Sequence, residues 1–108
     1  MNIKARQNGS ATVLELGGRF DAHDAPAAAA ALEKAIAVTP QRVVVSLESV
    51  SFMDSTALAI LVEGMKRRRQ AGGDLYLCGL QQPVRMIFEL TRLDKAVDIY
   101  TNEAEALR

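Results

Sequence analysis

The spacing of the hydrophobic positions changes near residue 50, and the change predicts a strand followed by a helix. Between Val43 and Leu47, four of the five residues are apolar and most are β-branched, which is typical of a strand buried on both faces. Between Leu58 and Met65 the apolar residues recur at i, i+3, i+4 and i+7, the spacing of one helical stripe. Residues 42–71 are therefore expected to fold as a strand, a tight turn and a helix.

The turn between this strand and this helix is rich in side-chain oxygens. Asp54, Ser55 and Thr56 are three consecutive candidates for the N-cap of the helix, and capping alone explains these residue types. In parallel α/β folds, however, sites lie at the carboxyl ends of strands, and a helix N-terminus favours negative charge. A hydroxyl group in this turn is therefore well placed to carry a phosphate.

A hairpin is predicted ahead of this central unit. Strands at 2–6 and 11–16 are joined at Asn8-Gly9, which is a strong turn signal, and Gly17-Gly18 is expected to end the second strand. Between the hairpin and the central unit, a helix is expected that Asp24 caps, that has Pro26 in its first turn and that stops at Thr39-Pro40. After the central unit, we expect a strand at 75–80 and a helix opened by Gln82-Pro83. A loop at 92–96, a strand at 97–100 and a short helix capped by Asn102 complete the chain. The order β-β-α-β-α-β-α-β-α implies parallel strands joined by crossover helices.

Three local patterns refine this picture. Gly72-Gly73 is expected to close the central helix with a glycine cap. The third helix should turn its inner stripe, Val84, Ile87, Phe88 and Thr91, towards the core. The basic run 66–69 is interpreted as a solvated helix end, where the helix dipole favours cations, with a contact to an acidic partner surface as the alternative.

Composition excludes several classes of function. A chain of 108 residues is expected to form one domain, 1–108, and its 49% hydrophobic residues can bury a small core. Thirteen basic and thirteen acidic residues give zero net charge, which argues against a nucleic-acid binder. No stretch approaches the ~20 apolar residues of a membrane span, and the start does not resemble a signal peptide, so a cytoplasmic location is expected.

The side chains that most often carry chemistry are scarce. Cys78 is the only cysteine, which fits a reducing compartment, and it is expected to pack in the core. His23 is the only histidine and lies in another predicted element, so no nucleophile and base are paired. Neither a metal nor a cofactor is expected, and an enzyme is the least favoured class of function.

The segment 52–58, Phe-Met-Asp-Ser-Thr-Ala-Leu, resembles the signature Phe-Met-Asp-Ser-Ser/Thr-Gly-Leu of the anti-sigma factor antagonists, the single-domain bacterial STAS proteins. Ala57 stands where glycine is usual. Residues 18–23 are similar to the family's Gly-Glu-Leu-Asp segment, residues 72–79 to its Gly-Gly turn and next strand, and residues 84–93 to its third helix and following loop. The resemblance spans nearly the whole chain, in order.

This resemblance implies an α/β STAS fold, a mixed five-stranded sheet with one antiparallel edge strand and four helices. It also implies a phosphorylation-switched binding protein in a partner-switching pathway. The unphosphorylated form would bind a GHKL-type serine kinase that is also an anti-sigma factor. Phosphorylation at Ser55 would release the protein, and a PP2C-type phosphatase would reverse the step. The residues implied in partner binding are Asp21, His23, Asp24, Phe52, Met53, Asp54, Ser55, Thr56, Ala57, Leu58, Ala59 and Glu63, with Asp54 also fixing the turn.

A second hypothesis is that the protein is an accessory subunit of a lipid-transport ABC complex, since some small STAS proteins have that role. The Asp-Ser-Thr triplet at 54–56 favours the switch. The sequence leaves open the identity of the kinase and phosphatase, the input signal, the oligomeric state, and whether the downstream target is a sigma factor or another system.

Overall fold

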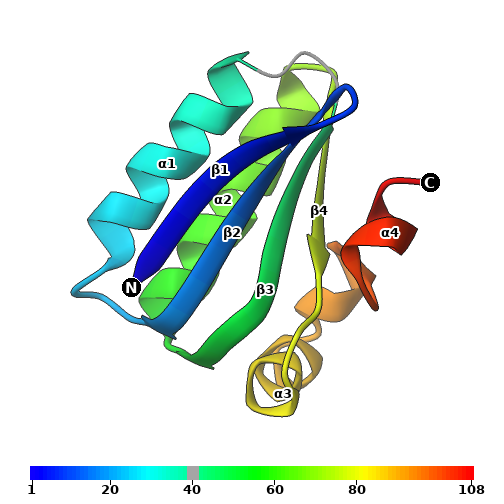
Figure 1. Cartoon of the computed structure of the whole chain (residues 1–108). Helices are drawn as coiled ribbons and strands as arrows, with labels where there is room; N and C mark the ends of the chain where they lie inside the picture. The colour runs from blue at the N-terminus through cyan, green and yellow to red at the C-terminus, as the bar shows by residue number, and fades with distance from the viewer. Residues whose placement is uncertain (39–41) are drawn as a thin grey trace.

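A five-stranded sheet runs through the middle of the molecule, and helices cover both of its faces (Figure 1). The structure is a computed structural model that describes residues 1–38 and 42–108. The strands are β1 (Asn2–Asn8), β2 (Ala11–Phe20), β3 (Arg42–Met53), β4 (Asp74–Cys78) and β5 (Asp98–Tyr100). The helices are α1 (Ala25–Val38), α2 (Ser55–Gln70), α3 (Gln82–Leu90) and α4 (Glu103–Ala106), with a 3₁₀ turn, η1 (Leu93–Lys95), before β5.

The sheet has the predicted mixed topology. Its spatial order is β1-β2-β3-β4-β5, with β1 antiparallel to β2 and all other neighbours parallel. The hairpin turns at Gly9, whose φ of 63° lies in the left-handed region that glycine adopts freely. Because β2, β3 and β4 are parallel, their carboxyl ends meet at one edge of the sheet, at the bottom of Figure 1, where α2 begins.

The prediction that Gly17-Gly18 ends the second strand is wrong, because β2 continues to Phe20. The two glycines lie instead in irregular pairing with β3, where the register shifts between Glu15 and Gly17 and again between Gly18 and Arg19. Gly18 has a φ of 94°, which a residue with a side chain rarely adopts. The strand therefore bends at the glycines and carries Arg19 and Phe20 to the edge of the sheet.

The main core lies between the sheet and the helices α1 and α2, with α3 closing one end. Leu58, Leu61 and Met65 of α2 are buried there, and the predicted helical stripe is confirmed. A smaller cluster lies on the other face, under α4, and includes Val13, Val44 and the buried Cys78 thiol. Burial raises the pKa of that thiol above its usual range, as expected for a packing cysteine.

The predicted ends of several helices are confirmed. The Gly72 N–H donates to Arg69 O and the Gly73 N–H to Arg68 O, with Gly72 at a φ of 85°, which is a Schellman motif after α2. Asn102 caps α4 through a 2.9 Å bond from the Glu105 N–H. Pro26 lies in the first turn of α1, whereas the predicted stop at Thr39-Pro40 falls outside the described residues.

Two predictions about side-chain exposure are wrong. Thr91, expected on the inner stripe of α3, is exposed at the end of the helix, where its hydroxyl donates to Ile87 O. Arg68, expected in a solvated helix end, is only 3% exposed. Its guanidinium lies between α1 and the turn after α2, and Nη1 donates to Ile36 O in the last turn of α1. Arg68 therefore works as an inter-helix cap, while its neighbours Lys66 and Arg69 are exposed as predicted.

Within the described part of the chain, none of the helices is long and apolar enough to cross a membrane.

Candidate functional site

The site is built on the junction between β3 and α2. Asp54 follows the last residue of the strand with an extended backbone, φ −102° and ψ −179°, and is the N-cap of α2. Its Oδ1 accepts a 2.9 Å hydrogen bond from the Ala57 N–H, and its carbonyl oxygen accepts the first helical bond from the Leu58 N–H. Of the three capping candidates in the sequence, the structure therefore selects Asp54.

The second oxygen of Asp54 reaches a different part of the chain. Oδ2 accepts a 2.9 Å bond from the Ala22 N–H in the loop between β2 and α1, and the Asp54 N–H donates to Phe20 O at 3.2 Å. The N–H of Ala57, with that of Ala22, holds the pKa of the Asp54 carboxyl below its usual range, and partial desolvation opposes the shift. One carboxylate thus joins the two loops at the carboxyl edge of the sheet.

The loop that Asp54 holds is itself fixed by Asp21. The Asp21 Oδ1 accepts hydrogen bonds from the N–H groups of His23 and Asp24, at 3.1 and 3.4 Å. The Asp21 carbonyl accepts from the Ala25 N–H at 2.9 Å. Asp24 precedes α1 at the predicted cap position, where its carbonyl accepts a 3.2 Å bond from the Ala28 N–H, while its carboxylate lies 3.8 Å from the N-terminal ammonium group. Asp21 therefore organises the start of α1.

Ser55 and Thr56 occupy the first two positions of α2, and both are exposed. Because Asp54 performs the capping, the Ser55 hydroxyl is not needed to close the helix. It projects where the unpaired N–H groups and the positive end of the helix dipole favour an added negative charge. The arrangement can accept a phosphoryl group on Ser55 without displacing a structural hydrogen bond that is recorded among the described residues.

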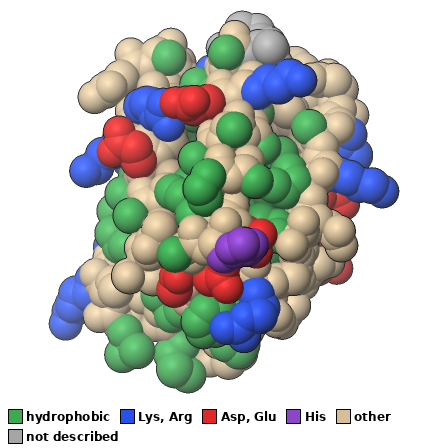
Figure 2. Space-filling view, turned by 90° about the vertical axis from the view of Figure 1, so that its left-hand side faces the viewer, with side chains coloured by type: hydrophobic (Ala, Val, Ile, Leu, Met, Phe, Trp, Pro, Cys, Tyr) green, Lys and Arg blue, Asp and Glu red, His purple; other side chains and the backbone are tan. Residues whose placement is uncertain are grey.

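The predicted site residues come from two segments, and the structure brings them together at one edge. His23, Phe52, Ser55, Thr56, Ala59 and Glu63 are exposed, and Asp21, Asp24 and Asp54 are half-buried. On the side of the molecule that carries α1, the single histidine, in purple, lies next to several acidic side chains in the lower half of the view, and other acidic side chains lie near the upper end (Figure 2).

Three members of the predicted contact surface need correction. Met53, Ala57 and Leu58 are buried, at 1%, 0% and 7% exposure, and all three belong to the main core. Their side chains cannot meet a partner, because alternate strand residues and the inner stripe of a helix point inwards. They fix the backbone that presents Asp54 and Ser55.

Arg19 is the residue of this edge that sequence reasoning missed. Its guanidinium carbon lies 4.1 Å from the centre of the Phe52 ring, and its Nε lies 3.9 Å from Asp21 Oδ2. Arg19 lies beside Phe52 because the two residues pair across β2 and β3, and this pairing depends on the register shift after Gly18. A strand pattern alone does not reveal that shift.

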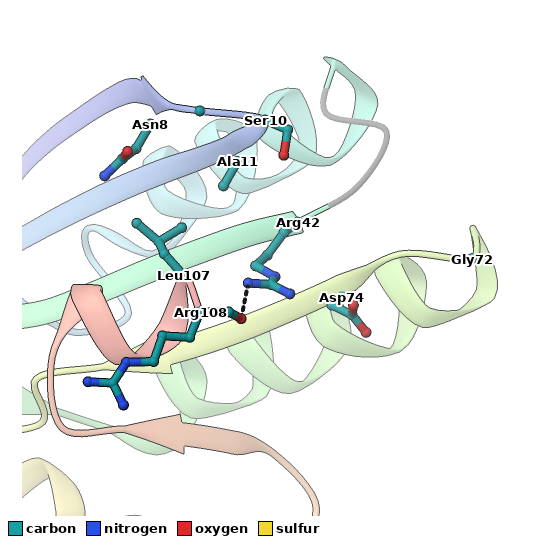
Figure 3. Close-up of a pocket in the computed structure, with 9 residues that line it drawn as sticks. Asn8, Ser10, Ala11, Arg42, Gly72, Asp74, Leu107 and Arg108 are labelled. Atoms are coloured by element: carbon teal, nitrogen blue, oxygen red, sulfur yellow. Dashed lines mark hydrogen bonds between the residues drawn. The ribbon is translucent and has the colours of Figure 1, made fainter.

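A separate hollow lies at the opposite, amino-terminal edge of the sheet (Figure 3). Its volume is about 610 Å³, and its lining includes Ser10, Arg42 and Asp74. Arg42 is already engaged, since Nη1 donates to the carbonyl oxygens of Ala106 and Arg108, at 3.1 Å each. These bonds tie α4 to the sheet. Among the described residues, no group of three or more His, Cys, Asp or Glu side chains is placed to hold a metal ion.

Comparison with known proteins agrees with this architecture. The family model of the STAS domain matches residues 2–106. The anti-sigma F factor antagonist of Paenibacillus polymyxa is 28% identical over 108 residues, covering 99% of this chain and 92% of that protein. The anti-sigma-B factor antagonist of Listeria monocytogenes is 35% identical over 92 residues, covering 83% of this chain and 79% of the relative.

Solved structures show the same fold. The anti-sigma factor antagonist SpoIIAA in its unphosphorylated form aligns with a TM-score of 0.81 at 22% identity, covering 98% of this chain and 93% of SpoIIAA. The Bacillus SpoIIAA in its phosphorylated form aligns with a TM-score of 0.74 at 21% identity, covering 98% and 96%. The chain described here belongs to the STAS domain family, in the group of the bacterial anti-sigma factor antagonists.

Proposed function

We propose that this protein is an anti-sigma factor antagonist that works as a phosphorylation switch. Its unphosphorylated form binds a GHKL-type serine kinase that also acts as an anti-sigma factor, and this binding frees the kinase's target. The kinase then phosphorylates Ser55, and the product dissociates. A PP2C-type phosphatase removes the phosphate and returns the protein to its binding form.

The main support for this proposal is that Asp54 caps the helix, which leaves the Ser55 hydroxyl exposed and free of a capping role. Asp54 uses both carboxylate oxygens to hold the turn, at 2.9 Å from the N–H groups of Ala57 and Ala22. Ser55 is therefore an exposed hydroxyl on a rigid backbone, at a helix N-terminus that tolerates negative charge. The names of the relatives support the role of an anti-sigma factor antagonist.

The surface around Ser55 supports a protein partner. Phe52 is a large apolar side chain that is exposed, and His23, Thr56, Ala59 and Glu63 lie exposed in the same two loops and the first turns of α2. Asp21, Asp24 and Asp54 add carboxylates between them. Apolar side chains within a polar rim are typical of a protein–protein contact.

The test begins with recovery of the kinase. The Ser55→Ala variant cannot be phosphorylated at this position, so it should retain a serine kinase from a lysate of the source bacterium, identified by mass spectrometry. That kinase, incubated with the wild-type protein and ATP, should transfer one phosphate, and phosphosite mapping should place it on Ser55.

Thr56→Ala is the matched control, because Thr56 is the neighbouring exposed hydroxyl. It should be phosphorylated to the same extent as wild type. Phosphate on Thr56, Ser51 or Ser49 would show that the switch residue is wrong. Recovery of a permease and an ATPase in place of a kinase would contradict the proposed function and favour an accessory subunit of a transport complex.

A further inference from the structure

Arg19 and Phe52 form an exposed pair at the rim of the candidate site. The Arg19 side chain is 64% exposed and Phe52 is 37% exposed, with the guanidinium 4.1 Å from the ring centre. A cation over an aromatic ring is attracted by the electrons of its face. Arginine and large aromatic residues are also enriched among the side chains that contribute most to binding at protein interfaces. The pair is therefore a candidate anchor for a partner.

The backbone brings the two side chains together through a bulge. Gly18 pairs with Val50, but the next residue, Arg19, pairs with Phe52, so β3 contains one extra residue at Ser51. Bulges of this kind change the direction of side chains and are frequent beside functional sites. The Arg19–Phe52 contact is thus a product of the local strand geometry.

The pair is also fixed relative to Ser55. One step further along the strands, Phe20 pairs with Met53, and both side chains are fully buried in the main core. The Phe20 carbonyl then accepts the Asp54 N–H at 3.2 Å. Arg19 is therefore held by the same strand ends that carry the start of α2, at the same edge of the sheet as Ser55.

The guanidinium of Arg19 keeps its hydrogen-bond donors available. Its nearest carboxylate oxygen, Asp21 Oδ2, lies 3.9 Å from Nε, which is too long for a hydrogen bond. No other side chain or carbonyl of the described residues is recorded as an acceptor for it. Stacking on Phe52 covers one face of the guanidinium and leaves its edge to solvent, and this edge is suited to two parallel bonds to a carboxylate.

Folding does not account for this arrangement, because exposed ion pairs contribute little to stability. Charge points to a role in recognition. Arg19 presents an exposed positive charge beside an exposed aromatic ring at the rim of the candidate site. A partner that meets this cation must offer a negative charge.

We propose that Arg19, held on the Phe52 ring, determines which partner this protein binds, by receiving an aspartate or glutamate side chain of the kinase. This inference rests on the proposed function, because it assigns a contact within the same kinase complex. Arg19 takes no part in phosphoryl transfer. It sets affinity and specificity at the edge of the surface that surrounds Ser55.

The test uses the kinase recovered with Ser55→Ala and measures its binding to Arg19 variants by calorimetry at low and high salt. Arg19→Glu should weaken binding at least tenfold and reduce the salt dependence, because an attraction between exposed charges becomes a repulsion. The kinase affinity of Arg19→Lys should fall between those of wild type and Arg19→Glu, since lysine keeps the positive charge but lacks the planar guanidinium group. In phosphorylation assays Arg19→Glu should raise KM and leave kcat unchanged.

Arg69→Glu is the matched control, because Arg69 is also half-exposed and 3.5 Å from one exposed aspartate, Asp98, but lies at the far end of α2. Its binding should stay within twofold of wild type. The inference is overturned if wild type binds the kinase and Arg19→Glu binds equally well, or if both charge reversals weaken binding alike. It is also overturned if Arg19→Glu changes the kinase affinity of only the phosphorylated protein, because Arg19 would then bind the phosphate within the same molecule. Absence of any kinase binding by wild type would instead refute the proposed function.

Discussion

At the scale of single residues, the geometry of the site depends on Asp54, because its two carboxylate oxygens accept hydrogen bonds from different segments of the chain. Oδ1 accepts from Ala57 within α2, and Oδ2 accepts from Ala22, 32 residues away in the chain. An asparagine has the same shape but only one acceptor oxygen, and its NH2 group would face an N–H group at the other position. Asp54→Asn should therefore keep the helix cap and lose the link between the loops.

The first prediction follows from the lowered pKa of Asp54. A carboxyl whose pKa is lower in the folded than in the unfolded state stabilises the fold at a pH above its unfolded pKa, which is about 3.9 for aspartate. This stabilisation is lost as the pH falls through the folded pKa. Asp54→Asn should thus have a lower urea midpoint than wild type at pH 7, and the difference should shrink as the pH falls below about 4.

Asp74→Asn is the control for this titration, since Asp74 is an exposed carboxylate at the opposite edge of the sheet. Its midpoint should follow that of wild type across the pH range. A difference between wild type and Asp54→Asn that stayed constant down to pH 2 would mean that the charge of Asp54 does not stabilise the turn.

At the scale of elements, α1 and α2 pack closely because α2 has a glycine where they cross. A Cβ atom on Gly64 would lie far inside van der Waals distance of Leu32 Cδ2 in α1. Leu32 is only 1% exposed, so its side chain has no free space to move into. The glycine therefore weakens α2 as a helix but allows the close contact between the helices.

The second prediction is a double-mutant cycle on this contact. Gly64→Ala should gain about 1 kcal/mol in helix propensity but lose about 1–3 kcal/mol through overpacking, so we expect a net loss of about 1 kcal/mol. In a Leu32→Ala background, where the obstructing atoms are absent, the same substitution should stabilise the protein. Free energies of unfolding from urea titrations of the four proteins measure the coupling. Equal effects of Gly64→Ala in both backgrounds would show that the helices do not meet at this point.

The same elements show how far sequence patterns reach. The helical stripe of α2 and the cap at Asn102 could be predicted, because each depends on neighbouring residues in the chain. The burial of Arg68 could not, because the carbonyl it caps, Ile36 O, belongs to another helix. The continuation of β2 through Gly17-Gly18 was also hidden, since glycine is typical both of strand ends and of bulges.

At the scale of the whole molecule, the site arises because parallel strands end at one edge. The resemblance of segments 18–23 and 52–58 to a known family predicted which residues gather there, and the fold places both segments at that edge. Met53, Ala57 and Leu58 point inwards because side chains alternate along a strand and only one stripe of a helix faces the core. A sequence motif by itself does not show which of its side chains point inwards. The pairing of Arg19 with Phe52 required the register of the sheet.

The last prediction concerns how a phosphate on Ser55, at the carboxyl edge of the sheet, would switch binding off. A phosphate on Ser55 adds about −1.5 to −2 charges next to Asp54. The helix N-terminus favours that charge by about 0.3–1 kcal/mol, and repulsion from the Asp54 carboxylate opposes it, so the free protein should keep its fold. In a complex the phosphate would have to be desolvated without a partner, which costs several kcal/mol. Phosphorylation should therefore act by local obstruction of the contact surface, with no refolding.

Ser55→Asp tests obstruction directly, because it places a permanent charge at the first position of α2. It should bind the kinase at least tenfold more weakly than wild type, a loss of about 1.4 kcal/mol or more. Ser55→Ala should bind and stay bound, and Ser10→Asp, an exposed serine at the hairpin on the opposite edge, should bind as wild type does. All three variants should keep the wild-type circular dichroism spectrum and a similar melting temperature, because the charge changes the surface and leaves the core untouched. Tight kinase binding by a folded Ser55→Asp would exclude obstruction. Weak binding with loss of the wild-type spectrum would show that the added charge acts through the fold, since the hydrogen bonds of Asp54 to both loops would then have failed.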